Sequence, residues 1–341
     1  MPLGESVLVV GAGVAGLACA RALSAAGASV SVIDRARGVG GRCATRRVEG
    51  QPVDLGVAFL HGRDPDFLAA LESVPATPLP GWPQEVHGTG RPCQPEAFRP
   101  GEGRRAYVEG VNAFPRWLAR GIGVRLGARV ERLELSDRLP RAVLEGGEAI
   151  EAETLVLALA PEQSGRLLAS APAAPSPVAT ARALLGMAAS EPSLSLAALY
   201  PSSADGPRWQ VCYPSESTVL QLASHDSTKR RAPRFLAMVF QAHPRWSRAH
   251  ADRPEWPDLL LAEAARLLGA WAAAPLHRHP HRWRFARTDR SGEMASPLLV
   301  RLPGGGRLGL CGDRFAPGGG VEAAWLSGRA LAGRILAEEG A

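Results

Sequence analysis

The sequence has almost no lysine. Lys229 is the only one among 39 basic residues, so arginine carries nearly all of the positive charge. The arginines are scattered along the whole chain, without a basic stripe interleaved with aromatic residues. Proteins that bind nucleic acid gather such charge on one face. The formal net charge of +6 therefore does not indicate a nucleic-acid partner.

Long apolar runs and paired cysteines are also missing. No stretch approaches the roughly 18 consecutive apolar residues that cross a bilayer. The chain enters the apolar run 7–10 without a signal-peptide pattern. We therefore expect a cytoplasmic protein without a membrane partner. The five cysteines are an odd number with no Cys-x-x-Cys spacing, which argues against a disulfide framework or a zinc knuckle.

One tract resembles a metal site. His277, His279 and His281 surround a proline, but no carboxylate or cysteine stands close to them. Such a tract is more typical of a polar strand end than of a ligand set. We therefore predict no metal.

The 341 residues suffice for two domains, and the first of them alternate strand and helix. Ser6–Val10 is predicted to be a strand, Leu17–Ala26 a helix closed by Gly27, and Ser29–Asp34 the next strand. Parallel strands joined by one helix predict a doubly wound α/β sheet with a ligand at its first turn.

Apolar periodicity predicts further elements, whereas residues 75–103 are rich in proline and glycine and show little of it. We expect helices at 112–120, at 258–273 and from 321 onward, extended segments within 124–135, and buried strands at 154–160 and 308–311. A proline-rich connector at 170–177 is predicted to cross between domains.

The first turn carries the pattern Gly-x-Gly-x-x-Gly. Gly11 permits the tight turn, Gly13 lets the backbone approach a pyrophosphate, and Gly16 allows the helix to pack closely on the strand. Free N–H groups at the helix start then hold the phosphates. Asp34 ends the next strand, where its carboxylate can accept hydrogen bonds from ribose hydroxyls. The predicted contacts of the turn are Gly11, Ala12, Gly13, Ala15 and Gly16.

A second glycine loop, Asp34-Arg35-x-x-Gly38-x-Gly40-Gly41-Arg42, distinguishes between cofactors. Nicotinamide dehydrogenases do not need it. Flavoproteins of the glutathione-reductase and amine-oxidase types do, because their extended FAD lays its pyrophosphate against this turn. We therefore predict FAD, held by Gly40, Gly41 and Arg42. Arg35 is either a further ligand or a solvated charge.

The chain up to Arg47 resembles the renalase-type FAD oxidoreductases, small members of the flavin amine-oxidase superfamily that include bacterial NAD/FAD-dependent oxidoreductases. Later stretches match this family too: Asp54–Phe59, where the family runs a strand past the flavin ring, Arg63–Phe67, His281–Ala286, Leu310–Asp313 and Gly320–Gly328. The match is poor at about 70–105 and at 165–275. The resemblance therefore indicates the cofactor more than the substrate.

The resemblance implies an α/β fold with a Rossmann-like FAD-binding domain of the glutathione-reductase/p-hydroxybenzoate-hydroxylase type and a second, α+β substrate domain. We predict the FAD-binding domain at 1–65, completed by 104–165 and 292–341. The substrate domain is then 66–103 with 166–291. Further implied cofactor contacts are Gly56, Val57, Val130, Gly312, Asp313, Gly320 and Val321.

The C-terminal motif also has a physical logic. Asp313 follows a buried strand, where it can accept a hydrogen bond from a ribityl hydroxyl. The helix from Val321 begins after three glycines, so its N–H groups and its positive end can face the flavin and stabilise negative charge there. From Arg329 on, we expect an ordinary amphipathic helix.

Two departures from the family bear on catalysis. Ala58 and Phe59 stand where the family has a Gln and a Tyr, which removes an amide and a hydroxyl from beside the ring. Amine oxidases proper use a lysine that reaches flavin N5 through water, but Lys229 lies in a polar stretch that is predicted to be a loop or turn. The C-terminal motif has no cysteine suited to covalent attachment. We expect non-covalent FAD and no lysine relay.

Catalytic residues stay unassigned, because the motif segments contain no nucleophile–base pair. The candidates beside the flavin are Phe59, His61, Trp283 and Phe285; a strand-end histidine and core aromatics remain the alternatives. We predict an FAD-dependent oxidoreductase that takes a hydride from a small reduced substrate, such as a dihydronicotinamide dinucleotide isomer, and passes electrons to O2. An amine or a biosynthetic intermediate is the alternative substrate. A non-catalytic flavin-binding sensor or partner protein is the alternative of another class.

Overall fold

The computed structural model describes residues 4–135, 138–171, 176–187, 189–203 and 206–339. The chain divides into two compact units. Unit 1 consists of Met1–Gly41, Phe114–Ser190 and Thr288–Ala341, and unit 2 of Arg42–Ala113 and Glu191–Arg287. Each unit is therefore built from segments that are distant in the sequence.

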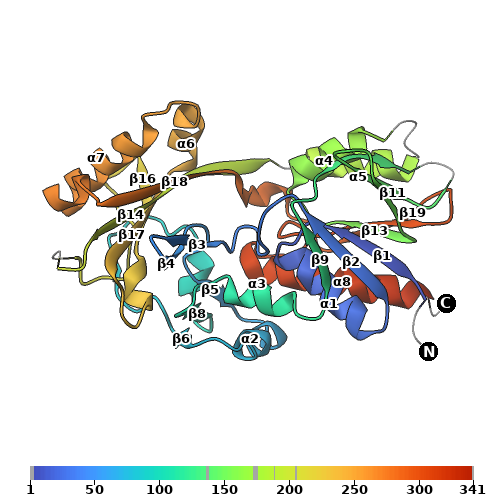
Figure 1. Ribbon diagram of the computed structural model, residues 1–341, viewed down its shortest axis with the longest axis horizontal. Helices are drawn as coiled ribbons and strands as arrows, with labels where there is room; N and C mark the ends of the chain where they lie inside the picture. Colours follow the sequence, from blue (N-terminus) through green and yellow to red (C-terminus); the bar gives the residue numbers. More distant parts are fainter. Residues whose placement is uncertain (1–3, 136–137, 172–175, 188, 204–205, 340–341) are drawn as a thin grey trace. The chain divides into compact units, whose positions relative to one another are not determined.

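Unit 1 is built on a six-stranded sheet (Figure 1). Its strands run in the order β19-β20-β13-β1-β2-β9, and every neighbouring pair is parallel except β19 with β20. The bounds are β1 Ser6–Val10, β2 Ser29–Asp34, β9 Gly123–Leu126, β13 Thr154–Leu157, β19 Leu298–Arg301 and β20 Arg307–Leu310. Strands β1 and β13 lie at the centre, where their continuous apolar runs are buried on both faces.

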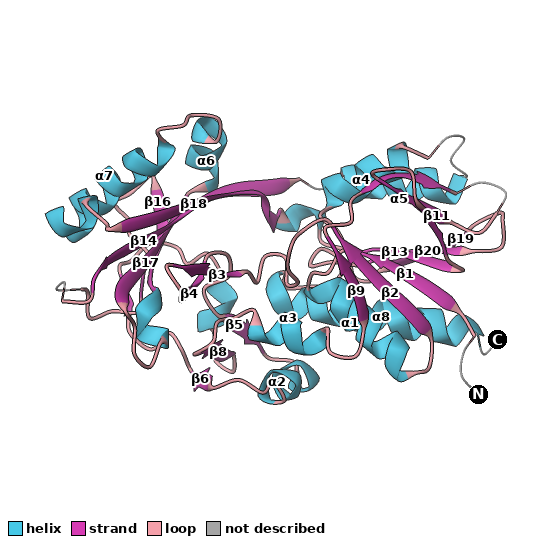
Figure 2. Cartoon of the chain, viewed as in Figure 1, coloured by secondary structure: helices cyan, strands magenta, loops and turns pink. Residues whose placement is uncertain are grey.

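Both faces of this sheet are covered. Apolar side chains of α4, α5 and a small sheet β10-β11-β12 join one core with the strands, and helices α1 and α8 lie on the opposite side (Figures 1 and 2). The bounds are α1 Val14–Ala25, α3 Ala113–Leu118, α4 Pro161–Ala169, α5 Ser176–Gly186, α8 Gly320–Glu339, β10 Val130–Glu134, β11 Arg141–Leu144 and β12 Ala149–Glu151.

Helix α8 packs so closely on α1 that their backbones are in contact. A Cβ added at Gly328 would lie 2.1 Å from the carbonyl oxygen of Ala15, so only glycine fits this position. Ala15 belongs to the first turn of α1, directly after the glycine pattern. The C-terminal motif is thereby fixed against the N-terminal one.

Unit 2 is built on a second sheet, in the order β18-β14-β17-β16-β15-β7 (Figure 2). Its strands are β7 Val86–His87, β14 Ser190–Pro201, β15 Val211–Cys212, β16 Leu220–His225, β17 Phe235–Ala242 and β18 His277–Thr288. Helix α7, Trp256–Leu268, covers one face, where Leu260 packs with Met238 and Phe240. Helix α6, Pro244–His250, follows β17 directly.

The other face of this sheet carries shorter elements. The hairpin β3–β4 packs with β14 and β17, and a three-stranded sheet β5-β8-β6 supplies a further core with β15 and β16. The bounds are β3 Thr45–Val48, β4 Gln51–Asp54, β5 Leu60–Gly62, β6 Pro78–Pro80, β8 Gly103–Tyr107 and α2 Pro65–Glu72. No helix in the described part of the chain has the length and apolarity that a bilayer crossing requires.

The N-terminal strands β1 and β2 have the predicted bounds, and the predicted α/β class with a Rossmann-like domain is confirmed. Other predictions need correction. Residues 55–59, predicted as a strand past the flavin, have no strand structure. The helix predicted over 258–273 ends at Leu268, because Gly269 has a φ of 105° and starts a separate 3-10 turn.

The predicted domain limits also differ from the two units. Residues 42–65 and 104–113 belong to unit 2, because their apolar side chains pack against the unit 2 sheet. Residues 166–190 belong to unit 1, because α5 packs into its core. The chain therefore passes between the units after Ser190 and not in the connector 170–177, of which 172–175 lie outside the described residues.

Candidate functional site

The first glycine turn has a backbone that only glycine can adopt. Gly11 has a φ of 114°, and a Cβ there would lie 2.4 Å from the carbonyl oxygen of Ala158. A Cβ at Gly16 would lie 2.1 Å from the carbonyl oxygen of Gly11. These two glycines therefore serve the turn and its packing, as the pattern predicts.

Gly13 differs from both, because a Cβ there would meet no atom within 4 Å. Its α-carbon borders open space, as a backbone that receives a phosphate must. The second loop lies beside it: Gly40 donates its N–H to the carbonyl of Ala12 at 2.8 Å and forms a bridge with Gly13. The two glycine loops predicted from the sequence are thus adjacent, and they fit an extended pyrophosphate.

The Asp34 carboxylate connects these loops. One oxygen accepts the N–H of Ala12 and the other that of Ala36, both at 2.8 Å. Each carboxylate oxygen has a second lone pair, so the group retains capacity for a ribose hydroxyl. That Asp34 holds the two loops together was not predicted from the sequence, although an Asp side chain can accept a hydrogen bond from the backbone N–H two residues later. Its ribose contact stays a prediction.

The C-terminal motif lies in the same unit. Gly312 donates its N–H to Ser327 Oγ at 3.1 Å, which connects the end of β20 to helix α8. Asp313 is 7% exposed and accepts a hydrogen bond from Thr288 Oγ1 at 3.2 Å. Gly318 and Gly319, which precede α8, and Gly320, its first residue, all have positive φ. The roles of Asp313, Gly320 and Val321 at the flavin stay predictions.

The remaining residues predicted to contact the cofactor differ in their burial and in their partners. Ala12 and Ala15 are buried at the first turn, and Val130 is buried where β10 begins. Arg35 is exposed, and its role as a cofactor ligand stays a prediction. Arg42 donates to the carbonyl of Ala286 at 3.4 Å and has further partners.

Residues 55–58 of unit 2 are held by side chains from distant strands. Trp283 Nε1 donates to the carbonyl of Leu55 at 3.3 Å, and Gln241 Nε2 to that of Gly56 at 2.5 Å. A Cβ at Gly56 would lie 2.0 Å from the carbonyl oxygen of Arg42. This segment, predicted to pass the flavin, therefore has a fixed backbone although it is not a strand.

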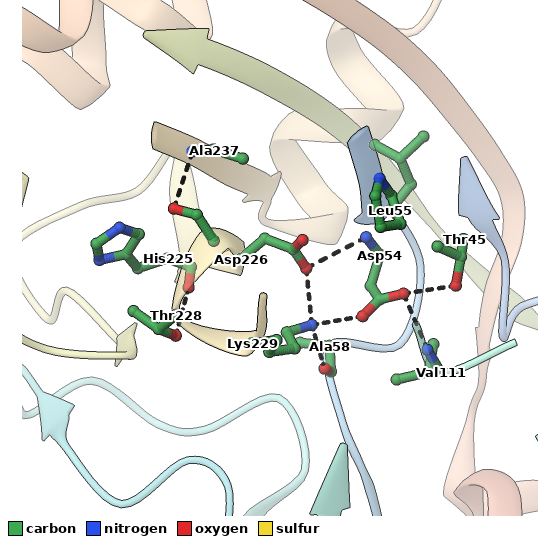
Figure 3. A network of polar contacts seen from close by, with 12 residues as sticks. Thr45, Asp54, Leu55, Ala58, Val111, His225, Asp226, Thr228, Lys229 and Ala237 are labelled. Atoms are coloured by element: carbon green, nitrogen blue, oxygen red, sulfur yellow. Dashed lines mark hydrogen bonds and ion pairs between the residues drawn. The ribbon is translucent and has the colours of Figure 1, made fainter. Parts of the chain in front are cut away.

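A buried ion network anchors both ends of this segment (Figure 3). Lys229 Nζ contacts Asp54 Oδ2 and Asp226 Oδ1, each at 2.7 Å, and donates to the carbonyl of Ala58 at 2.8 Å. Arg230 Nη2 contacts the same two carboxylates at 3.1 and 2.7 Å. The lysine and both aspartate side chains are 0% exposed. Two carboxylates thus balance two cations inside the core.

The network is saturated with hydrogen bonds. The second oxygen of Asp54 accepts from Thr45 Oγ1 at 2.6 Å and from the N–H of Val111 at 3.0 Å (Figure 3). Burial alone would raise the pKa of Asp226, but Lys229 and Arg230 hold it below its ordinary value. The Asp226 carboxylate therefore favours its ionised form, and the network acts as a structural joint.

This joint was missed from the sequence, which predicted a loop or turn at Lys229. The residue lies in a buried 3-10 turn, Asp226–Lys229. All three of its N–H bonds have acceptors, so its ammonium is not free to hold a catalytic water. The signal available in the sequence was a lone lysine close to an Asp and next to an Arg. Its other carboxylate partner, Asp54, lies 175 residues earlier in the chain.

The four catalytic candidates all lie in unit 2 but in different surroundings. The ring of Phe59 is 0% exposed and packs against Trp82 and Phe98 at 5.9 and 6.1 Å between centroids, so it is a core residue. His61 is 8% exposed and contacts Glu102 at 3.3 Å, so it is not a surface histidine. Trp283 and Phe285 alternate on β18, half-buried.

No group of three or more His, Cys, Asp or Glu among the described residues has the arrangement of a metal site. His277, His279 and His281 occupy alternate positions of β18. Burial lowers the pKa of His279 and of His281, and Arg46 adds to that effect. Both therefore favour the neutral form.

The family is decided by a match over most of the chain. The model of flavin containing amine oxidoreductases matches residues 84–336, and an NAD(P)-binding Rossmann-like domain matches residues 9–73. The chain belongs to the flavin containing amine oxidoreductase family. Membership confirms the predicted FAD and the class of FAD-dependent oxidoreductase, while the reaction of this chain is a matter for proposal.

Curated relatives match over short stretches only. "Putative flavin-containing monoamine oxidase AofH" of Mycobacterium tuberculosis is 45% identical over 80 residues, which is 23% of this chain and 17% of that protein. Polyamine oxidase 4 of Oryza sativa subsp. japonica is 47% identical over 57 residues, which is 17% of this chain and 12% of that protein. The chain thus spans less than a fifth of the length of these relatives.

Solved structures match over nearly the whole chain. A variant of putrescine oxidase superimposes with a TM-score of 0.74 at 17% identity, covering 98% of this chain and 99% of that one. Cyclohexylamine oxidase from Brevibacterium oxydans IH-35A gives a TM-score of 0.72 at 16% identity, covering 99% and 100%. At such identities the likeness shows the fold alone.

Proposed function

We propose that the chain is a renalase-type FAD-dependent oxidase that takes a hydride from a small reduced substrate without a side-chain base. The observation that carries this proposal is the state of Lys229. It is the only lysine of the chain, and both of its carboxylate contacts and its carbonyl contact are buried. A water relay of the amine-oxidase type therefore has no lysine to hold it.

The residues of unit 1 bind and orient the cofactor in this proposal. Gly13 and Gly40 receive the pyrophosphate, Asp34 the ribose, and Asp313 a ribityl hydroxyl. The first turn of α8, after its glycines, favours negative charge beside it. Bound FAD supplies the hydride acceptor and returns electrons to O2.

The substrate we propose is an isomer of a dihydronicotinamide dinucleotide. Its ring becomes aromatic when a hydride leaves, so no proton has to be removed by the protein. This requirement agrees with the state of Lys229, whose three buried contacts leave it no capacity to hold a catalytic water.

Oxidation of a small amine is the second candidate. The names of the structural neighbours, putrescine oxidase and cyclohexylamine oxidase, favour it. An amine must lose a proton as well as a hydride, and His61, paired with Glu102, is then the candidate base.

An anaerobic titration of the purified yellow protein decides between these candidates. We expect denatured protein to release FAD stoichiometrically. We also expect the oxidised-flavin absorbance to fall with a dihydronicotinamide isomer and to return in air. Bleaching by putrescine or cyclohexylamine alone would favour the amine reaction. A flavin inert to every reductant would instead favour a non-catalytic flavin-binding protein.

A further inference from the structure

A buried tyrosine of unit 2 has a hydroxyl without a partner. Tyr213 follows β15 directly, and 1% of it is exposed. Its hydroxyl has no hydrogen-bond partner among the described residues. A buried polar group that is left unpaired costs free energy, so such groups normally meet a partner.

One guanidinium group is packed beside this tyrosine. The Cζ of Arg104 lies 5.2 Å above the ring of Phe98, and the Phe98 ring meets that of Tyr213 edge-on at 6.1 Å. Arg104 donates one N–H bond, from Nη1 to the carbonyl of Ala97 at 3.1 Å. Its Nε is buried without an acceptor among the described residues.

A second guanidinium group approaches from the sheet. Arg287 Nη1 donates to Gln221 Oε1 at 2.9 Å. Gln221 precedes Leu222, which packs in the same hydrophobic core as Tyr213 and lies next to Ala223, the partner of Cys212 in the β15–β16 register. Both arginines act on the phenol: burial raises the pKa of Tyr213, whereas the charges of Arg287 and Arg104 lower it.

No carboxylate balances these two charges in the described part of the chain, where neither Arg104 nor Arg287 forms an ion pair. Glu102, two residues before Arg104, is already engaged by His61 and Arg63. Buried Arg230, by contrast, has two aspartates. Two half-buried guanidinium groups and a hydroxyl donor without acceptors together favour an anion.

We propose that Arg104, Tyr213 and Arg287 bind an oxyanion group, a carboxylate or a phosphate, of the organic substrate. Its assignment as a substrate site rests on the proposed function, whereas the inference that it binds an anion does not. Planar guanidinium groups match both anions, and the tyrosine donates a third hydrogen bond. The site is an unusual one for an oxidase of simple diamines, because its charge would repel a second ammonium group.

Calorimetric titration of the full-length, FAD-loaded protein tests the site without turnover. The probes are benzoate and phenyl phosphate, with benzamide as the neutral analogue. We expect at least one of the two anions to bind saturably and benzamide not to bind. Arg104→Gln and Arg287→Gln should each lower the affinity for that anion at least tenfold, and Tyr213→Phe should lower it several-fold. Arg284→Gln removes an equal charge from the exposed side of β18 and should leave the affinity unchanged.

Several outcomes would overturn the proposal. These are no saturable binding of either anion, equal binding of benzamide, or an equal loss in Arg284→Gln. Tyr213→Phe keeps the ring in the core and therefore stays informative if an arginine variant fails to fold. A protein that binds the anion but holds no FAD would refute the proposed function and leave the anion site standing.

Discussion

At the scale of single residues, the only lysine of the chain is a structural cation. Lys229 joins Asp54, which ends β4, to Asp226, which lies 172 residues later in the chain. A charge with three fixed acceptors in a core serves geometry, because it cannot exchange partners without exposing an unpaired ion. The backbone of 54–58 owes its position to this joint.

Replacement of the lysine should therefore damage stability more than chemistry. We expect Lys229→Met to lower the free energy of unfolding by about 3–5 kcal/mol, because it leaves two buried carboxylates with one cation. Urea unfolding measures the loss, and Arg125→Met, which removes an exposed partner of Glu148, is the control with little expected change. Unchanged stability in Lys229→Met would contradict the joint. In the surviving folded fraction, flavin reduction should slow by less than about tenfold.

At the scale of elements, the glycine turn was predictable from the sequence. The helix that follows the turn and the helix of the C-terminal motif were predictable too, because the signals for all three are local. An apolar run, a fixed glycine spacing and an Ala/Leu-rich helix stand within the first 26 residues. The conformation of 55–59 was not predictable. Its carbonyls are held by Trp283, Gln241 and Lys229, at least 171 residues away, and no local pattern records such partners.

The glycine turn gives a sharp contrast between two similar substitutions. Gly13→Val should abolish flavin retention and leave the chain folded, because its added side chain meets only the open space proposed for the pyrophosphate. Gly16→Val should instead destabilise the fold, since its Cβ would collide with the carbonyl of Gly11. The readouts are FAD content after desalting and thermal unfolding. Full FAD occupancy in Gly13→Val would show that the phosphates lie elsewhere.

Helix α8 offers a matched pair on one element. Gly328→Ala should destabilise unit 1, because the new methyl would lie 2.1 Å from the carbonyl oxygen of Ala15. Gly333→Ala, one and a half turns later, meets nothing within 4 Å and should stabilise the helix by up to about 1 kcal/mol. Denaturant unfolding of the two variants provides the comparison. Equal effects would mean that the close packing of α8 on α1 is wrong.

At the scale of the whole molecule, the α/β class, FAD and the flavin-dependent oxidoreductase family followed from both ends of the chain. The domain limits did not, because they depend on where residues 42–65 and 104–113 pack, and their partners lie on strands of the second sheet. The proposed anion site was equally hidden from the sequence. Arg104 and Tyr213 stand in the two stretches of weak resemblance, and Arg287 directly follows the matching stretch His281–Ala286, so no local motif joins the three.

In the proposed reaction, reduction of the flavin needs no side-chain base. The most direct measurement is stopped-flow loss of the oxidised-flavin absorbance under anaerobic conditions, in His61→Ala and in the unchanged protein, with a dihydronicotinamide isomer as reductant. We expect the rate to fall by less than about tenfold, below the usual loss for a general acid–base residue. A thousandfold fall would contradict the account and return amine oxidation, with His61 as its base, to first place.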